Sequence, residues 1–348
     1  MSRHFPALRG LAILLVIVNH AITLTLDTSR QYGYPPPADW ERAILVGLRG
    51  FGLVAVPIFL FLSGYFAVYA MRGKAAGAAF RSVRTSLKHI AFPYVLWSIV
   101  FYLGIYALLG ESYTIPEYAK FLLVGYPFNF VPLLVVFYLV SPLLIPAAER
   151  TPWLVLAGVG LYQLFVVFVQ LPGLMGVTLP GWATYLTPPG LRLTIALWGI
   201  FFPMGVVFSQ QEERLKPALH RVWPVLAVLS LGLYLTATLD VLGLVVAPLA
   251  GFLLPIAAIP LLPLLRRETI PAVRRFELLG RNAYGLYLTN LLLISLVLAG
   301  AQALAPSLFL AVGLLAAIAG AAAIVVPSAV ATALDRSARP KLRLYVFG

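Results

Sequence analysis

Arg9 and His20, near the start of the chain, are side chains whose types and spacing could do chemistry. Eleven positions separate them, which on an α-helix is about 20° beyond three full turns and a rise of about 16 Å, so both would lie on one face. A guanidinium binds phosphate oxygens through its planar fork, and an imidazole takes up a proton near neutral pH. The pair suits a long carrier molecule with phosphates at one end and a reactive group at the other. A structural interpretation, an Arg that extends to the membrane surface and a His held by a hydrogen bond, stays equally open.

The segment that positions this pair is one of many long apolar stretches. Of the 348 residues, 61% are hydrophobic and 11% are charged, whereas soluble domains carry about 25% charged residues. Apolar runs of about 18 residues or more can cross a bilayer as helices, and these runs lack the alternation of a transmembrane β-barrel. We expect an all-α, polytopic transmembrane helical bundle of about ten spans, near residues 8–26, 45–70, 87–109, 119–146, 153–170, 191–210, 222–240, 243–264, 280–300 and 307–333.

The basic residues are distributed unevenly between alternate loops. The segments on one side hold only Arg30, Arg42, Arg49, Lys120 and Arg192, and the rest of the 25 Lys and Arg residues fall on the other side. Basic residues concentrate in cytoplasmic loops, so we expect both termini in the cytoplasm. The net charge of +13 then reflects topology and not nucleic-acid binding. We expect a multi-pass protein of the cell (inner) membrane, with an uncleaved first helix, as a single integral-membrane domain over 1–348 without an appended soluble domain.

Several kinds of chemistry are excluded or disfavoured. The chain has no cysteine, which excludes disulfides, thiolate nucleophiles and cysteine-ligated iron–sulfur clusters. It has no Walker loop, no dinucleotide fingerprint and no paired-histidine zinc motif. His4, His89 and His220 are expected at the cytoplasmic edges without a carboxylate at ligand spacing, so we expect no metal site. We interpret Lys74 and the basic cluster at 266–275 as topology charges.

Four stretches, taken in order along the chain, resemble signatures of the membrane acyltransferase-3 family. They are Leu8-Arg9-Gly10 with His20 eleven residues after the Arg, Phe59-Leu60-Phe61-Leu62-Ser63-Gly64-Tyr65, the pair Arg81 and Arg84 followed by Phe92-Pro93-Tyr94, and Arg281-Asn282-Ala283-Tyr284-Gly285-Leu286-Tyr287-Leu288.

The resemblance implies a ten-helix O-acyltransferase. Such an enzyme takes an acyl group from a cytoplasmic donor, usually acetyl-coenzyme A, and passes it to a hydroxyl of a sugar, a lipid-linked glycan or another small acceptor, as in O-acetylation and polysaccharide modification. No cofactor would be bound permanently, because acyl-CoA is a substrate. The expected partners are acyl-CoA, a carbohydrate or lipid-linked acceptor and membrane lipid, and no nucleic acid.

The same resemblance assigns roles to particular residues. The paired Arg and His of the family fall on Arg9 and His20, and its cytoplasmic Arg pair falls on Arg81 and Arg84. Lys88 adds a third cation to that basic run, and these cations would bind the phosphates of the donor. His20 would be the general base for the acceptor hydroxyl or would itself accept the acyl group, and the sequence leaves both open.

Three further residues are weaker candidates. Ser63 and Tyr65 flank Gly64, which permits close approach of helices. Ser63 could donate a hydrogen bond to a developing oxyanion, or it could belong to a small-residue notch for helix packing. Asn290 stands where the family has a His late in the chain; an Asn cannot act as a base, but it can donate a hydrogen bond.

Two other functions compete with an acyltransferase. One is a transporter or flippase for a glycan or lipid intermediate, and the other is an inactive family member that acts as a scaffold. The chain has no inverted repeat and no acidic residue well inside an expected span for ion coupling, which favours the enzyme.

Overall fold

The computed structural model describes residues 5–71, 73, 76–336 and 340–348, and this part of the chain contains helices and no strand. It forms two compact units. Unit 1 comprises Met1–Val56, Ile99–Glu111 and Leu219–Gly348, and unit 2 comprises Pro57–Ser98 and Ser112–Ala218. Some of the basic residues and histidines considered above lie outside the described residues. They are Arg3, His4, Arg72, Lys74 and Arg339.

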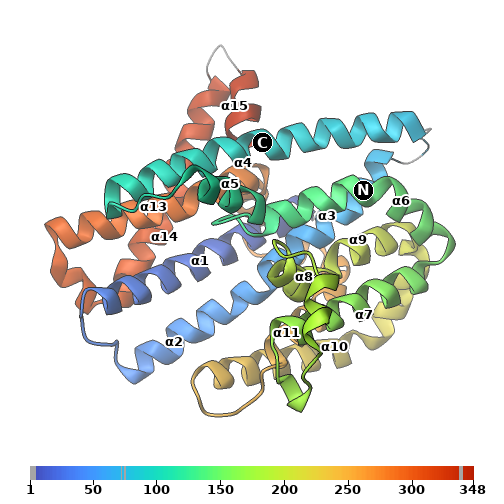
Figure 1. The fold of residues 1–348 in the computed structure, drawn as a ribbon, viewed down its shortest axis with the longest axis horizontal. Coiled ribbons are helices and arrows are strands. Elements are labelled where there is room, and N and C mark those ends of the chain that lie inside the picture. The colour runs from blue at the N-terminus through green and yellow to red at the C-terminus, as the bar shows by residue number, and fades with distance from the viewer. Residues whose placement is uncertain (1–4, 72, 74–75, 337–339) are drawn as a thin grey trace. The chain divides into compact units, whose positions relative to one another are not determined.

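The helices follow one another along the chain as shown in Figure 1. The α-helices are α1 (Phe5–Gln31), α2 (Asp39–Gly50), α3 (Ala55–Met71), α4 (Ala76–Leu109), α5 (Ile115–Val124), α6 (Phe130–Arg150), α7 (Pro152–Gln170), α8 (Arg192–Trp198), α9 (Phe201–Gln210), α10 (Glu212–Val241), α11 (Ala250–Ala258), α12 (Val273–Arg281), α13 (Ala283–Leu304), α14 (Val312–Arg336) and α15 (Pro340–Phe347). Short 3-10 helices are η1 (Phe51–Val54), η2 (Leu174–Gly176), η3 (Gly181–Leu186), η4 (Ile259–Leu264), η5 (Arg267–Thr269) and η6 (Pro306–Leu310).

The prediction of a polytopic helical membrane protein is confirmed. Within the described residues, 8 helices are long and apolar enough to cross a membrane. They are α1, the combined segment Asp39–Met71, Phe80–Leu108 within α4, α6, α7, α10, α13 and α14. The pair α8 and α9, which is bent by 44°, makes a ninth if it is one broken span.

The predicted span 119–146 is wrong at its start. Its first part is a separate helix, α5, where the side chain of Glu117 accepts a hydrogen bond from the backbone N–H of Thr114 at 2.8 Å. Helix α5 ends at Gly125, whose φ of 86° lies in the left-handed region that glycine adopts without a steric penalty. Helix α6 begins only at Phe130, so the span itself is Phe130–Arg150.

The predicted span 243–264 is shorter than expected. Its apolar helix is Ala250–Leu264, which consists of α11 followed by η4. The segment before it turns at Gly243, with a φ of 78°, and the Asp240 carboxylate accepts a hydrogen bond from the backbone N–H of Ala247 at 2.8 Å. These interactions stabilise a non-helical backbone. The first residues of the predicted range therefore form a loop and not part of a helix.

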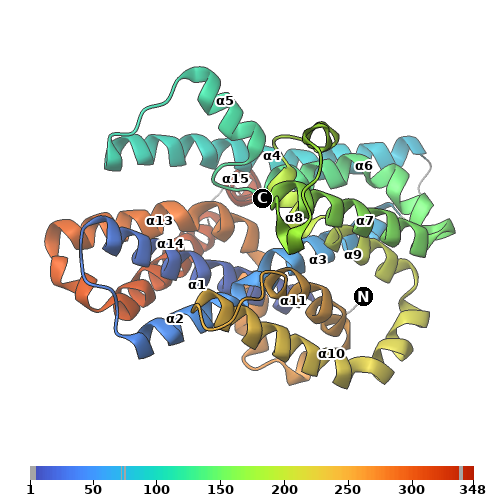
Figure 2. The same ribbon diagram turned by 60° about the horizontal axis from the view of Figure 1, so that its bottom comes forward.

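Unit 1 is built around α1, which packs against α12 and against α13 and α14 (Figures 1 and 2). Two glycines allow α1 and α12 to approach closely. A Cβ on Gly10 would overlap with the carbonyl oxygen of Phe276, and a Cβ on Gly280 would overlap with the carbonyl oxygen of Pro6. The glycine of the Leu8-Arg9-Gly10 stretch therefore has a packing role, since any side chain there would push α12 away.

Unit 2 has a similar contact between α3 and α9. A Cβ on Gly64 would overlap with the carbonyl oxygen of Phe202, and one on Gly205 would overlap with the carbonyl oxygen of Phe61. Phe202 also stacks on Phe137 of α6, with ring centroids 4.9 Å apart and 2° between the planes. The predicted close helix approach at Gly64 is confirmed.

Candidate active site

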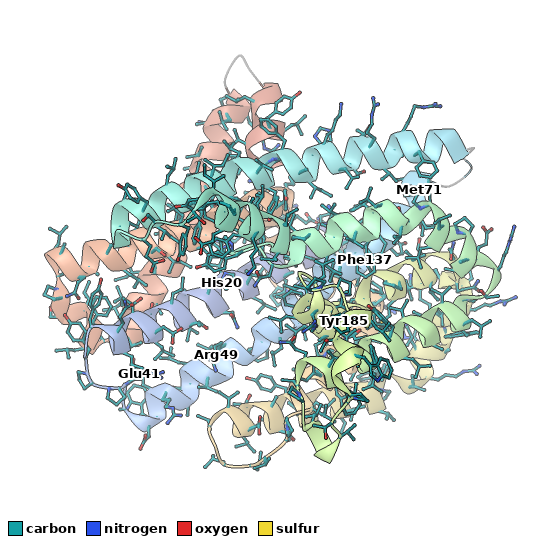
Figure 3. All side chains as sticks on the ribbon, viewed as in Figure 1. His20, Glu41, Arg49, Met71, Phe137 and Tyr185 are labelled. Atoms are coloured by element: carbon teal, nitrogen blue, oxygen red, sulfur yellow. The ribbon has the colours of Figure 1, made fainter. Side chains whose placement is uncertain are left out.

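Arg9 and His20 lie on the same uninterrupted helix, α1 (Phe5–Gln31). Both side chains are half-buried, and His20 is labelled on α1 in Figure 3. Because α1 contains no break between them, the two side chains share a face with a rise of about 16 Å between them. Gly10, next to Arg9, fixes this end of α1 against α12.

His20 makes a short hydrogen bond to Asn290 of α13. The Nδ1 atom of His20 lies 2.7 Å from Oδ1 of Asn290. Asn290 is fully buried, and its Nδ2 donates to the backbone carbonyls of Leu286, at 3.2 Å, and of Tyr287. Both side chains belong to unit 1, although they are far apart in sequence.

This arrangement selects one tautomer of His20. A flipped Asn290 amide would place its oxygen against two carbonyl oxygens, so the contacts of Nδ2 determine the orientation of the amide. Oδ1 can only accept a hydrogen bond, and therefore Nδ1 of His20 must carry the hydrogen. In a neutral imidazole the lone pair is then on Nε2. Nε2 is the atom that can take a proton as a general base or attack a carbonyl carbon as a nucleophile.

The neighbour of His20 has a structural contact of its own. Asn19 Nδ2 donates to the backbone carbonyl of Arg49 at 3.2 Å, and a Cβ on Gly52 would lie 2.7 Å from the Asn19 side chain. Asn19 thus ties α1 to the junction of α2 and η1. The two polar residues of the Asn19-His20 pair therefore contact different elements of unit 1.

Ser63 and Tyr65 lie on α3 in unit 2. Ser63 is half-buried and precedes the close-packed Gly64. Tyr65 is fully buried; its hydroxyl donates to Glu212 Oε2 at 2.9 Å and lies 3.0 Å from the hydroxyl of Tyr69. Glu212 also accepts a hydrogen bond from Lys216 at 2.8 Å. The Tyr65 hydroxyl thus donates its hydrogen bond to a carboxylate, and this contact joins α3 to the start of α10. The oxyanion role stays a prediction for Ser63.

Arg81, Arg84 and Lys88 form a basic stripe on α4. Their spacing of three and four residues places them on one helix face, and all three side chains are exposed. The stripe lies within unit 2. Such an exposed row of cations can bind a polyphosphate without the cost of burying a charge.

A pocket of about 670 Å³ lies in unit 2 next to Arg81, the first residue of this stripe. Two polar atoms near it are buried without a hydrogen-bond partner in the described residues, namely Oγ of Ser209 and Oε1 of Gln210. The lining residues come from the ends of α3, α6 and α9, from the start of α4 and from the residues that follow α3 and α9. They are Val68, Tyr69, Met71, Gly73, Phe80, Pro142, Leu143, Ile145, Pro146, Glu149, Ser209, Gln210 and Gln211. Because Phe80 directly precedes Arg81, a ligand in the pocket could extend to the stripe.

The expected site residues are therefore divided between the two units. Unit 1 holds Arg9, His20 and Asn290, and unit 2 holds Ser63, Tyr65, Arg81, Arg84 and Lys88. The contact of Asn290 with His20 is the feature of the site that the sequence alone does not predict, because there Asn290 stands out only as an Asn at a position where the family has a His. Among the described residues, no group of three or more His, Cys, Asp or Glu side chains is arranged to hold a metal ion.

Comparison with known proteins gives one family. The family model described as an acyltransferase domain, of the acyltransferase-3 type, matches residues 5–326. The match begins with α1 and ends within α14, so it includes every candidate residue named above. A search of the curated proteins found no match, and a search of the solved structures found none either.

Proposed function

The chain belongs to the membrane acyltransferase-3 family, and from this premise we propose that it moves an acyl group, in the simplest case acetyl, from a cytoplasmic acyl-coenzyme A to a hydroxyl of a sugar, a glycan or another small acceptor. The observation that carries the proposal is the hydrogen bond between His20 and Asn290, at 2.7 Å. It leaves Nε2 of His20 as the proton acceptor on a membrane-spanning helix.

The transfer needs one base and produces an ester and free coenzyme A. The acceptor oxygen forms a bond to the acyl carbon while its proton goes to Nε2 of His20. The carbon–sulfur bond of the thioester breaks, and the departing thiolate receives that proton from Nε2. In the covalent variant, Nε2 attacks the acyl carbon and the carbon–sulfur bond breaks, which releases the thiolate. The acceptor hydroxyl then attacks the acyl-imidazole, the bond between Nε2 and the acyl carbon breaks, and the hydroxyl proton passes to the thiolate to give coenzyme A. Asn290 supports both routes in the same way, because it holds the proton on Nδ1.

We assign donor binding to the cations. Arg9, at the end of α1 away from His20, would hold phosphates of the donor, as would the stripe of Arg81, Arg84 and Lys88. The pocket next to Phe80 offers space for part of the donor molecule in unit 2. Acceptor and membrane lipid would meet the protein from other sides, and no cofactor would stay bound between turnovers.

The proposed topology has ten crossings with both termini in the cytoplasm, in the inner membrane. The 8 clear spans and the bent pair account for nine, and the apolar helix Ala250–Leu264 would supply the tenth. The bias of Lys and Arg toward alternate loops supports this orientation.

The test is release of coenzyme A from acetyl-coenzyme A by the purified full chain. Wild type would be compared with His20→Ala and with His220→Ala, which removes an exposed histidine and serves as the matched control. We expect slow turnover in wild type and in His220→Ala, and a loss of about 10²-fold or more in His20→Ala. Equal turnover in all three would refute the role of His20. If no variant turns over and the donor does not raise the melting temperature of wild type, a transporter or a scaffold becomes the better interpretation.

Donor binding is tested separately. Arg81→Gln and Arg84→Gln should each raise the apparent KM for acetyl-coenzyme A by about tenfold, the loss of one charge-assisted hydrogen bond, while kcat and the melting temperature stay unchanged. Arg150→Gln removes an exposed cation of unit 2 outside the stripe and should leave KM unaltered. An unchanged KM in both stripe variants would show that the stripe does not bind the donor.

A further inference from the structure

A small pocket in unit 1 lies among α12, α14 and the C-terminal helix α15. Its volume is about 150 Å³. It is lined by Leu278, Leu279, Arg281, Asn282, Ser328, Thr332, Asp335 and Arg343. Helix α15 packs against α13 and α14, and both α15 and Asp335 lie beyond the residues that match the acyltransferase family.

Arg343 reaches into this pocket with one donor unused. Its Nη2 donates to Oδ1 of Asn282, and its Nη1 lies 3.4 Å from a carboxylate oxygen of Asp335. Its Nε is buried and has no hydrogen-bond acceptor among the described residues. A buried charged donor without an acceptor costs free energy, so this N–H points to a ligand that can accept a hydrogen bond.

A second buried group at the same place is the hydroxyl of Ser328. Its Oγ also has no partner among the described residues, and one turn further along α14 the hydroxyl of Thr332 donates to the carbonyl of Ser328. Arg281 brings a second guanidinium to the pocket and is exposed. Asp335 is the only carboxylate among the described lining residues, and its side chain is 51% exposed, so the charge inside the pocket is positive.

We propose that this pocket binds a phosphate group, carried either by an anionic lipid headgroup or by a free phosphate ion. Phosphate oxygens accept hydrogen bonds from guanidinium and hydroxyl groups, which are the two kinds of donor left unused here. The pocket has room for one phosphate with a few waters. It lies at the end of the membrane-spanning helix α14, where lipid headgroups meet a protein.

The proposed phosphate would also hold α15 in place. Arg343 belongs to α15, whereas Ser328 belongs to α14, so a ligand bound to both side chains bridges the two helices. Phe347 of the same helix lies against Gly285 of α13. Phosphate binding therefore adds to the contacts that dock the end of the chain on unit 1.

The experiment measures the melting temperature of the full chain in detergent while the ligand is titrated. One arm uses inorganic phosphate, and the other uses short-chain phosphatidic acid against a phosphatidylcholine background. Ser328→Ala removes one hydroxyl and keeps α15 attached, and Arg343→Gln removes the guanidinium. Arg221→Gln is the matched control, because it removes an exposed cation of unit 1 that does not line the pocket.

We expect wild type and Arg221→Gln to gain stability alike. Ser328→Ala and Arg343→Gln should need about tenfold more ligand for the same gain. A response to inorganic phosphate identifies free-ion binding, and a response to phosphatidic acid alone identifies a lipid headgroup. The proposal is overturned if neither ligand raises the melting temperature of wild type, or if Ser328→Ala responds as wild type does. If Arg343→Gln fails to fold, the response of Ser328→Ala alone tests the phosphate site. The melting temperature does not depend on acyl transfer, so this result is independent of the proposed function.

Discussion

Among single residues, Asn290 determines which ring nitrogen of His20 is free for the proposed chemistry. Its amide oxygen receives the Nδ1 hydrogen of His20, while its amide nitrogen is bound by two backbone carbonyls of its own helix. A buried amide with all its groups used in this way cannot rotate without losing hydrogen bonds. Asn290 is a positioning residue, because it acts through His20.

Replacing Asn290 with Leu should lower kcat and leave KM for the donor unchanged. Without the amide oxygen, Nδ1 no longer has an acceptor and the wrong tautomer becomes accessible, so we expect kcat to fall by about tenfold or more. Thr289→Val is the control, since Thr289 is buried beside it but its hydroxyl bonds to the carbonyl of Gly285. A kcat in Asn290→Leu equal to that of Thr289→Val would contradict the positioning role.

The sequence predicted half of this pair. His20 could be found from its spacing to Arg9, because both lie on one helix and helical periodicity is regular. Asn290 is 270 positions away from His20, and only the packing of α13 beside α1 brings the two together. The sequence does contain one hint of this contact. An amide inside a membrane span is costly without a hydrogen-bond partner, and few polar side chains on other spans could serve as one.

At the scale of helices, the contact between α1 and α12 should be sensitive to a single methyl group. Gly10→Ala and Gly280→Ala each place a Cβ against a backbone carbonyl, which cannot move aside as a side chain can. We expect each to destabilise the protein by roughly 1–3 kcal/mol, seen as a lower melting temperature. Gly232→Ala in α10 meets nothing within 4 Å, and it should be neutral or stabilising. A Gly10→Ala variant as stable as Gly232→Ala would disprove the close approach.

The ion pair between η5 and α12 gives a pH dependence. Arg267 Nε and Nη2 bind the two carboxylate oxygens of Glu277 at 2.6 and 2.9 Å, and this hydrogen bonding lowers the pKa of Glu277 below its usual 4.5. A carboxyl with a lowered pKa in the folded state contributes stability above its unfolded pKa and loses it as the pH falls. The effect is small, because both side chains of the pair are partly exposed to solvent.

Melting temperatures of wild type and Glu277→Gln measured between pH 7 and pH 3 would check this. The advantage of wild type should be constant at neutral pH and should shrink below about pH 4.5. Glu268→Gln, which removes an exposed neighbouring carboxylate, should show no such convergence. A difference between wild type and Glu277→Gln that does not change with pH would rule out the linkage.

Helix breaks were harder to predict than helices. Between α8 and α9 the chain bends by 44°, and Gln163 of α7 supports the bend: its Nε2 donates to the carbonyl of Ala196 at 2.9 Å, and its Oε1 accepts from the N–H of Ile200 at 2.8 Å. A helix can break inside a membrane only if another group binds the freed backbone. Because that group comes from another helix, hydropathy along residues 191–210 gives no sign of the break.

For the whole molecule, composition was enough to predict an all-helical membrane protein but not the number of crossings. Ala250–Leu264 is shorter than the clear spans. Hydropathy alone therefore does not show whether this helix crosses the membrane or enters it and stays within it. The position of every later residue relative to the membrane depends on this helix. In the proposed orientation, the basic cluster at 266–275 faces the cytoplasm if this helix crosses; if it does not cross, that cluster faces the other side, against the bias of Lys and Arg.

Single cysteines in the natural chain, which has none, can decide the question with a membrane-impermeant maleimide on right-side-out vesicles. Gln31→Cys and Leu244→Cys should react at once, whereas Glu268→Cys and Gly348→Cys should react only after permeabilisation; all four positions are exposed. Reaction of Glu268→Cys from outside would mean that Ala250–Leu264 does not cross. Since α13 and α14, which lie between residues 268 and 348, are both long and apolar enough to cross the membrane, we expect these two positions to agree in either topology. A disagreement between them would instead place the error in the pair α13 and α14, on which the position of Asn290 depends.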